Sequence, residues 1–198
     1  MTLGCVMMAA GGSTRFGSNK LLQTVESVPL FRRALQAIPE DVFEDVIVVT
    51  GFGPVAAAAE ARGFTVVRND RPEEGISRTI RLGLEQLGHC DGVLFMTADQ
   101  PYLTQSTLRS LAEAFAADPA GIHAAAHNGQ RGNPCLFPRD CFPALLQLQG
   151  DRGGGSVIAR NLHRLRLTEV SARELADADT PEALAALRGT CGRCDCSV

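Results

Sequence analysis

Residues 3–20 read LGCVMMAAGGSTRFGSNK, an apolar run followed by a long loop of small and polar residues. The run Leu3 to Met8 is typical of a buried strand. The loop after it holds three glycines and two cations, Arg15 and Lys20. Glycine leaves the backbone bare and conformationally free, so amides from Ala10 through Ser13 can donate to an anionic ligand. The stretch therefore predicts a first strand that ends in an anion-binding loop.

Two familiar phosphate-binding motifs do not fit this loop. The dinucleotide fingerprint G-x-G-x-x-G needs another spacing, because Gly11 and Gly12 are adjacent here and Gly17 follows later. The phosphate loop G-x4-G-K-[ST] matches at Gly12 and Gly17, but Lys20 comes two residues late. We therefore expect a longer loop that wraps a triphosphate, in which Arg15 and Lys20 neutralise phosphate charge as pyrophosphate leaves. The alternative is a mobile loop whose two cations are solvated.

Length, composition and charge limit the class of protein. The 198 residues suffice for one packed domain, and 45% of them are hydrophobic. The net charge of -3 gives no bulk positive charge, so we expect neither nucleic acid nor a membrane surface as a partner. No apolar run approaches the ~20 residues of a membrane span, and no secretory signal is evident. We therefore expect a cytoplasmic protein whose seven cysteines are mostly reduced.

Three of the cysteines end the chain in the sequence CGRCDC, at Cys191, Cys194 and Cys196. Their spacing suits a metal site, but zinc and iron–sulfur sites usually need four ligands, and no fourth lies nearby. A frayed terminus with oxidisable thiols is the preferred interpretation. We therefore predict one folded domain over residues 1–188 and a cysteine-containing tail over residues 189–198.

Apolar runs alternate with segments of helical periodicity along most of the chain, which is typical of a doubly wound α/β domain with a largely parallel sheet. Thr104 and Asp140 are expected helix starts. Residues 54–63 begin with proline and end with glycine, as a short helix should. The expected strands are Leu3 to Met8, Val46 to Thr50, Phe64 to Val67, Val93 to Thr97, Gly121 to Ala126, Pro134 to Phe137 and Leu165 to Val170.

The sequence TADQP, residues 97–101, closes one of these strands with a carboxylate at Asp99. Ligands of doubly wound sheets bind beyond the carboxyl ends of the strands, so this loop and the opening loop are expected to meet at one crevice. Mg²⁺ prefers oxygen ligands and commonly uses one or two carboxylates together with substrate phosphates. We therefore expect Asp99 to hold Mg²⁺ against a nucleotide. The alternative is a helix cap, for which Thr104 is better placed.

Six motifs in this order resemble the molybdenum cofactor cytidylyltransferases of the nucleotidyltransferase superfamily. The motifs are AAGGSTRFGSNKLL, RPEEGISRTIRLGL, MTADQP, GQRGNPCLF, GDRGG and DADTPEAL, within residues 3–187. The resemblance implies a three-layer α/β/α, Rossmann-like fold with a mainly parallel mixed sheet. It also implies transfer of CMP from CTP to metal-bearing molybdopterin, with release of pyrophosphate. The similar guanylyltransferases usually have one alanine before the two glycines, whereas Ala9 and Ala10 both precede Gly11 here, which favours cytidine.

The same resemblance implies which residues contact each substrate. Arg15, Lys20 and Asp99 would carry the catalysis, and Asp179, with Asp177 as the alternative, would join Asp99 as a metal ligand. Either aspartate could instead cap the final helix. The nucleotide would contact Ala9, Ala10, Gly11, Gly12, Ser13, Arg15, Lys20, Gly75, Ser77 and Thr79, with Arg78 beside them. The pterin would contact Gly132, Asn133, Pro134, Gly150, Asp151 and Gly153. The GQRGNP segment, Gly129 to Pro134, is expected as a loop between two strands. Glycine pairs also make ordinary turns, which is the alternative for this segment and for GDRGG.

Such a reaction needs positioning and charge neutralisation more than a protein nucleophile, because the terminal phosphate of the pterin is already anionic. The histidines are accordingly expected in structural or surface roles. Three alternatives stay open: guanylyl transfer, cytidylyl transfer to a sugar or polyol phosphate, and a chaperone that inserts the cofactor with little catalysis of its own. A molybdoenzyme or an insertion chaperone is the protein partner that the resemblance implies.

Overall fold

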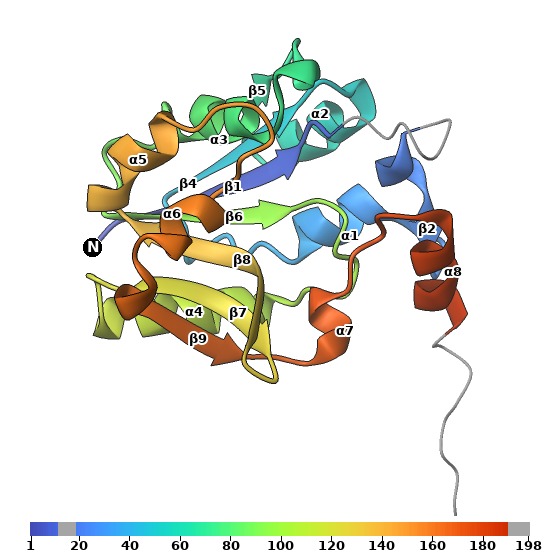
Figure 1. Cartoon of the computed structure of the whole chain (residues 1–198). Coiled ribbons are helices and arrows are strands. Elements are labelled where there is room, and N and C mark those ends of the chain that lie inside the picture. The colour runs from blue at the N-terminus through green and yellow to red at the C-terminus, as the bar shows by residue number, and fades with distance from the viewer. Residues whose placement is uncertain (12–18, 190–198) are drawn as a thin grey trace, which may run out of the picture.

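The computed structural model describes residues 1–11 and 19–189, and its centre is a seven-stranded sheet (Figure 1). The strand order is β5-β4-β1-β6-β8-β7-β9. The strands are β1 (Leu3–Ala9), β4 (Asp45–Thr50), β5 (Thr65–Arg68), β6 (Gly92–Thr97), β7 (Ile122–His127), β8 (Gln130–Pro138) and β9 (Leu165–Glu169). Strands β5, β4, β1 and β6 are parallel, β8 is antiparallel to β6 and β7, and β9 is parallel to β7. This mixed, mainly parallel sheet confirms the predicted fold class.

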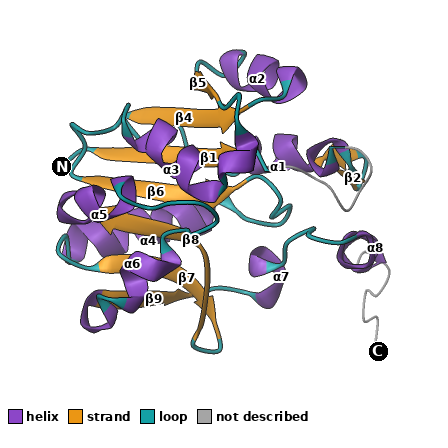
Figure 2. Ribbon diagram, turned by 45° about the horizontal axis from the view of Figure 1, so that its top comes forward, coloured by secondary structure: helices purple, strands orange, loops and turns teal. Residues whose placement is uncertain are grey.

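Helices cover both faces of the sheet, which confirms the expected three layers (Figure 2). One face carries α1 (Leu30–Gln36), α2 (Gly53–Glu60) and α4 (Gln105–Ala117), and the other carries α3 (Ile76–Leu84), α5 (Phe142–Leu146) and α6 (Gly155–Ala159). Successive residues of a strand point to opposite faces, so Met7 of β1 packs with the first group and Val6 with the second. Both side chains are fully buried. Two hydrophobic cores therefore fix the central strands and their ends.

The carboxyl ends of β1 and β6 lie side by side. The two strands pair in parallel, with Met8 opposite Thr97. The backbone amide of Ala98 donates to the carbonyl of Met8 at 3.2 Å and extends the pairing past the end of β6. The residues that follow the two strands therefore begin at the same edge of the sheet, as predicted.

Two local predictions need correction. The segment Gly129 to Pro134, expected as a loop, is mostly strand, because Asn128 and Gly129 have φ values of 50° and 73° and make a two-residue hairpin turn directly before β8. The helix predicted to start at Asp140 begins two residues later: Asp140 lies in the 3-10 turn η4 (Arg139–Cys141), which leads directly into α5, and its carboxylate accepts from Arg164 at 2.9 Å. Thr104, by contrast, caps α4 as predicted, since its hydroxyl accepts from the amide of Thr107.

A smaller unit stands beside the sheet at its carboxyl edge. It consists of the ribbon β2 (Thr24–Val25) and β3 (Val28–Pro29) together with α8 (Pro181–Gly189), which Figure 1 shows next to β2. Val25, Ala178 and Leu184 share a buried cluster. The turn η2 (Lys20–Leu22) precedes the ribbon, and α7 (Ala172–Leu175) precedes α8. The unit thus brings the segments around Lys20 and Asp179 to the same edge.

The remaining short turns are η3 (Pro72–Glu74) and η5 (Leu162–Arg164). Within the described parts of the chain, no helix has both the length and the apolarity to cross a membrane. Helix α8 ends at Gly189, and Cys191, Cys194 and Cys196 lie outside the described residues. The division into a domain of residues 1–188 and a tail of residues 189–198 stays a prediction.

Candidate functional site

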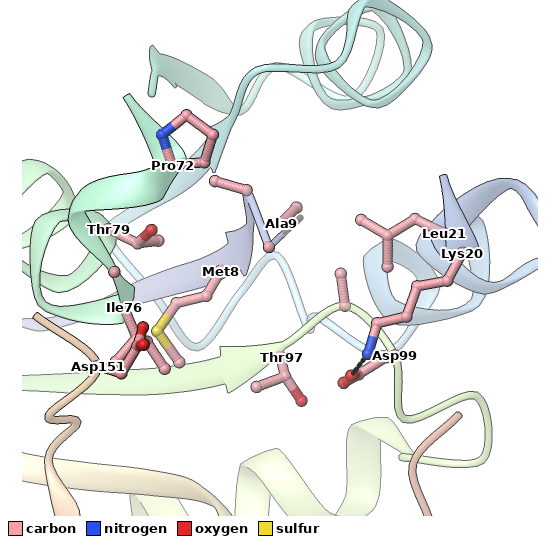
Figure 3. Close-up of a pocket in the computed structure, with 14 residues that line it drawn as sticks. Met8, Ala9, Lys20, Leu21, Pro72, Ile76, Thr79, Thr97, Asp99 and Asp151 are labelled. Carbon is pink, nitrogen blue, oxygen red and sulfur yellow. Dashed lines mark hydrogen bonds and ion pairs between the residues drawn. The ribbon is translucent and has the colours of Figure 1, made fainter. Parts of the chain in front are cut away.

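A cavity of about 330 Å³ opens where β1 and β6 end (Figure 3). Its walls come from the ends of these strands, from η2, and from the start of α3 with the turn before it. Of the residues predicted to contact the nucleotide, those that line it are Ala9, Ala10, Gly11, Lys20, Gly75 and Thr79. Ser77 does not line it, because the side chain is buried and its amide donates to the carbonyl of Gly150 at 3.1 Å. Gly12, Ser13 and Arg15 lie outside the described residues.

Lys20 lies between two carboxylates at this cavity. Its Nζ is 2.6 Å from Oδ2 of Asp99 and 2.7 Å from Oδ1 of Asp179. Burial lowers the pKa of the Lys20 ammonium, but the charge of Asp99 and the hydrogen bonds to Asp179 and Asp99 outweigh burial and raise the pKa above its ordinary value. Lys20 therefore stays protonated, and the two predicted metal ligands both contact its ammonium.

The two carboxylates differ in exposure and in remaining partners. The Asp99 side chain is 13% exposed, and the Asp179 side chain is 57% exposed. Oδ1 of Asp99 is buried and has no hydrogen-bond partner among the described residues. Burial, and then the charges of Asp179 and Asp99, raise the pKa of Asp177, the alternative ligand. The site therefore gathers negative charge and offers an unsatisfied buried oxygen, the donor set that a hard divalent cation prefers.

Gln100 holds the Asp99 loop in place, a role that the sequence analysis missed. Its side chain is 4% exposed, and its Nε2 donates to the carbonyls of Asn133, at 3.2 Å, and Leu175, at 3.1 Å. One amide thereby ties the turn after β6 to strand β8 and to the end of α7. The sequence signal was a polar residue between Asp99 and Pro101, which does not by itself reveal its distant partners.

Asp179, on the segment between α7 and α8, does not line the cavity but contacts Lys20, which does. The amide of Ala178 donates to the carbonyl of Asp99 at 3.1 Å, so the backbones that carry the two carboxylates are joined directly. Thr180 caps α8, because its hydroxyl accepts from the amide of Ala183 at 3.1 Å. Asp179 is therefore not needed as the cap, and its carboxylate faces Lys20 instead.

The GDRGG segment packs against the start of α3, and its residues do not all line the same cavity. Gly75 has φ of 86°, and a Cβ there would come within 2.4 Å of the Gly150 backbone, so only glycine fits. Asp151, predicted on the pterin side, lines the first cavity together with residues predicted for the nucleotide, and Gly150 lines neither this cavity nor the next one described. This close contact brings the loop of Asp151 over the start of α3, which spacing in the sequence does not reveal.

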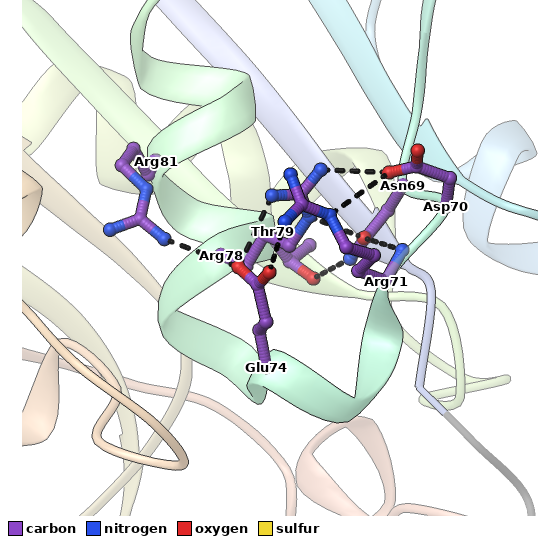
Figure 4. Close-up of polar contacts among 7 residues, drawn as sticks. All are labelled: Asn69, Asp70, Arg71, Glu74, Arg78, Thr79 and Arg81. Carbon is purple, nitrogen blue, oxygen red and sulfur yellow. Dashed lines mark hydrogen bonds and ion pairs between the residues drawn. The ribbon is translucent and has the colours of Figure 1, made fainter.

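Arg78 binds residues of the segment 69–74, which precedes α3 (Figure 4). It does not line the cavity, although it was expected on the nucleotide side. Its guanidinium donates to Asn69 at 3.0 Å, to Asp70 at 2.8 Å and to Glu74 at 3.2 Å. Asn69 is buried and donates in turn to the hydroxyl of Thr79 at 3.1 Å. Arg78 therefore fixes the wall that contains Gly75 and Thr79.

A second cavity, of about 210 Å³, adjoins the first, and Met8 and Ile76 line both. Its walls include apolar side chains, the cation Arg131, and two residues predicted on the pterin side, Asn133 and Gly153. Gly132 and Pro134, from the same prediction, do not line it. Arg131 was not among the predicted residues, although it stands in the quoted motif GQRGNPCLF.

The described residues contain no group of three or more His, Cys, Asp or Glu side chains placed to hold a metal ion. A site completed by protein ligands alone, such as structural zinc, does not match Asp99 and Asp179. A pair of carboxylates matches the way Mg²⁺ is usually held, with substrate phosphates and water supplying the other ligands. His123, which is buried with Nε2 2.9 Å from the carbonyl of Asp118, has the expected structural role.

Comparison with known proteins matches this chain to one family. The sequence profile described as the MobA-like NTP transferase domain covers residues 5–166. The purine catabolism protein PucB of Bacillus subtilis is 27% identical over an alignment 191 positions long, which covers 89% of this chain and 91% of PucB. The 3-deoxy-manno-octulosonate cytidylyltransferase of Bdellovibrio bacteriovorus is 32% identical over 115 residues, which are 58% of this chain and 46% of that enzyme.

Solved structures share the whole fold. A nucleotidyl transferase from Methanothermobacter, Mth528, superposes with a TM-score of 0.79 at 25% identity, over 94% of this chain and 96% of that one. Rv0371c of Mycobacterium tuberculosis H37Rv, solved in complex with manganese, superposes with a TM-score of 0.73 at 25% identity, over 94% and 98% of the two chains. Each superposition therefore includes nearly all of both chains.

Proposed function

Because the chain belongs to the family of MobA-like NTP transferase domains, we propose that it transfers CMP from CTP to a molybdopterin that bears its metal. Nucleotidyl transfer itself follows from the family; the two substrates are the proposal. The observation that most supports it is the convergence of Lys20, Asp99 and Asp179 at the cavity edge, beside the bare backbone of Gly11. This combination provides positive charge, amides and oxygen ligands for a triphosphate.

Asp99 and Asp179 are the residues that would hold Mg²⁺. The test of fit is the buried Oδ1 of Asp99, which lacks a partner among the described residues and lies in a site that gathers carboxylates. The manganese complex of the related Rv0371c also supports the binding of a divalent cation. A bound cation would neutralise charge on the phosphates as pyrophosphate departs.

The protein's own groups bind and orient the reactants. The backbone around Ala10 and Gly11 faces the cavity and can donate to phosphate oxygens, while Lys20 brings a positive charge to the same edge. A phosphate oxygen of the acceptor attacks the α-phosphorus of CTP, and the bond to the bridging oxygen of pyrophosphate breaks. No side chain has to act as a nucleophile, so rate enhancement comes from alignment and charge neutralisation. Arg15 is proposed to contact the leaving phosphates.

Ala10 supports cytidine over guanine as the base. Its side chain lies in the wall of the cavity and is almost fully buried. A glycine there would enlarge the cavity, so the alanine favours the smaller pyrimidine. The related cytidylyltransferase of Bdellovibrio agrees with CTP as donor. We expect Ala10→Gly to lower the kcat/KM ratio of CTP over GTP by about tenfold.

The second cavity is the proposed place of the acceptor. It adjoins the nucleotide cavity along Met8 and Ile76, and it pairs apolar walls with the charge of Arg131. A planar ring system with an anionic group matches this chemistry, which suits a pterin phosphate better than an entirely polar sugar phosphate. The similarity to a cytidylyltransferase whose name specifies a sugar acid keeps carbohydrates, as a broader acceptor class, as the competing candidate.

A screen of nucleotides against acceptors tests the proposal. Purified protein is incubated with Mg²⁺, with CTP, GTP, ATP or UTP, and with metal-loaded molybdopterin or a panel of sugar and polyol phosphates, while pyrophosphate release is measured. We expect turnover with CTP and the pterin, and a pterin dinucleotide by mass spectrometry. Turnover only with a sugar phosphate would overturn the acceptor, turnover only with GTP would overturn the base, and binding of the pterin without turnover would favour an insertion chaperone.

A further inference from the structure

Lys20 is the only lysine among the 19 lysine and arginine residues of the sequence. Its ammonium contacts both carboxylates that are proposed to hold the divalent cation. The proposed function also requires that ammonium at the phosphates. The ammonium cannot contact the carboxylates and the phosphates at the same time. In the structure it contacts the two carboxylates.

We propose that Lys20 is an exchangeable counter-ion: it neutralises Asp99 and Asp179 in the metal-free protein, gives up this position to the divalent cation, and turns to the phosphates of the nucleotide. This inference rests on the proposed function and adds an order of events to it. Lys20 is then a positioning residue for the carboxylates before binding and a direct phosphate contact afterwards.

The surroundings of the pair explain why a counter-ion is needed. Asp99 is largely buried, and its loop is held by Gln100 and by the hydrogen bond between Ala178 and the Asp99 carbonyl. This loop cannot swing out to solvate its charge. A buried carboxylate without a compensating charge is strongly destabilising, and here a second carboxylate adds repulsion. The ammonium removes both costs until another cation replaces it.

The attachment of Lys20 allows the exchange. Its turn is anchored on both sides, because Oδ1 of Asn19 accepts from the amide of Leu21 at 3.0 Å and the Leu21 side chain is buried. The backbone therefore stays in place while the flexible four-carbon side chain of lysine moves. Arginine, with a larger planar head, would fit the space between two converging carboxylates less well.

A consequence is that metal and nucleotide bind cooperatively. A divalent cation that binds alone must displace Lys20 without offering it a new partner, whereas bound triphosphate supplies that partner. Linkage requires the same factor in both directions, so metal also raises nucleotide affinity. Removal of Lys20 should therefore strengthen the binding of metal alone while it reduces this mutual enhancement.

The first test measures Mn²⁺ affinity by titration calorimetry without nucleotide. We expect Lys20→Met to bind Mn²⁺ more tightly than the wild type by at least about fivefold. The matched control is Arg160→Met, which removes one charge from an exposed position outside both cavities and should leave the affinity unchanged. With a non-hydrolysable CTP analogue, the gain in Mn²⁺ affinity should be smaller in Lys20→Met than in the wild type. Equal or weaker Mn²⁺ binding by Lys20→Met would overturn the inference.

The second test needs no variant and uses the single lysine as a probe. Acetylation of Lys20 by an amine-reactive ester is followed by mass spectrometry. We expect slow modification of the metal-free protein, faster modification with Mn²⁺ alone, and renewed protection with Mn²⁺ and the CTP analogue together. An unchanged or slower reaction with Mn²⁺ would contradict the exchange. Absence of Mn²⁺ binding to the wild type would instead contradict the metal site of the proposed function, so the two failures are distinguishable.

Discussion

The two carboxylates that meet at Lys20 come from different kinds of structure. Asp99 follows a central strand of the sheet, is largely buried, and belongs to a loop that Gln100 holds on two sides. Asp179 lies on the connection between two short helices, is more than half exposed, and depends on the packing of α8 against the ribbon β2–β3. The sheet thus supplies one fixed carboxylate, and a peripheral unit supplies one adjustable carboxylate.

This difference teaches which half of the site should tolerate change. The position of Asp99 follows from the pairing of β1 with β6, so it cannot shift without disturbing the core. The position of Asp179 is tied to that loop by one backbone bond from Ala178, and the rest of its support lies at the periphery. We therefore expect a graded series of losses, largest at the sheet and smallest at the outer helix α7.

Asp99→Asn should have the largest effect. The amide is close in size, so the fold should persist, but the loss of a buried anionic ligand removes charge stabilisation and should lower kcat by about a thousandfold. Pyrophosphate release measures the rate, and thermal unfolding confirms that the protein is folded. A folded variant with activity within tenfold of the wild type would remove Asp99 from the metal role.

Asp179→Asn should cost less. Because the side chain is exposed, water can replace the lost oxygen ligand, and we expect a decrease of about ten- to a hundredfold that is partly recovered at higher Mg²⁺ concentration. The Mg²⁺ dependence of pyrophosphate release measures this. A loss as deep as that of Asp99→Asn, unrelieved by Mg²⁺, would break the distinction between a fixed and an adjustable ligand.

Gln100→Leu tests whether the fixed ligand depends on its support. The change leaves the carbonyls of Asn133 and Leu175 without their donor and should lower the free energy of unfolding by about 2 kcal/mol. Activity should fall as well, because the loop that carries Asp99 loosens. Urea unfolding and kcat are measured together. The matched control is Gln105→Leu, which removes a similar bond to the Gln36 carbonyl at an exposed site and should change stability by less than about 0.5 kcal/mol.

The sequence was sufficient for features that depend on local pattern. Alternating apolar and helical segments predicted the sheet, and the strand before Asp99 predicted that its carboxylate would reach the same edge as the opening loop. Asp179 was preferred over Asp177, and its carboxylate is the one that contacts Lys20. The roles of these residues in catalysis stay predictions, as do those of Gly12, Ser13 and Arg15.

Features that depend on contacts between distant segments were beyond the sequence. The partners of Gln100 are 33 and 75 positions away, and nothing in its neighbours indicates them. Asp151 lines the same cavity as residues predicted for the nucleotide because the backbone of Gly150 packs against Gly75. Arg78 was expected beside the nucleotide contacts, but its guanidinium donates to three side chains of the segment before α3, those of Asn69, Asp70 and Glu74. In each case the residue type allows several positions, and contacts with distant segments determine which one the side chain takes.

Glu174→Gln should have the smallest effect on activity and a pH-dependent effect on stability. Glu174 anchors α7 to the start of α4, because its carboxylate accepts from Thr104 at 2.9 Å and from Thr107. Burial raises its pKa, but hydrogen bonds from Thr107, Thr104 and Ser171 outweigh burial and lower the pKa below its ordinary value. A depressed carboxyl pKa adds stability above the ordinary Glu value of about 4.3, and this stability is lost as pH falls through the folded-state pKa.

The wild type should therefore exceed Glu174→Gln by about 1 kcal/mol at pH 7, and the two should converge in acid. Urea unfolding across this pH range measures the difference, and Glu60→Gln, at an exposed position on α2, is the control that should show no such trend. Because α7 leads into the segment of Asp179, kcat should fall only a few-fold. A gap that persists unchanged in acid would mean that side-chain shape, and not the charge of Glu174, holds the outer half of the site.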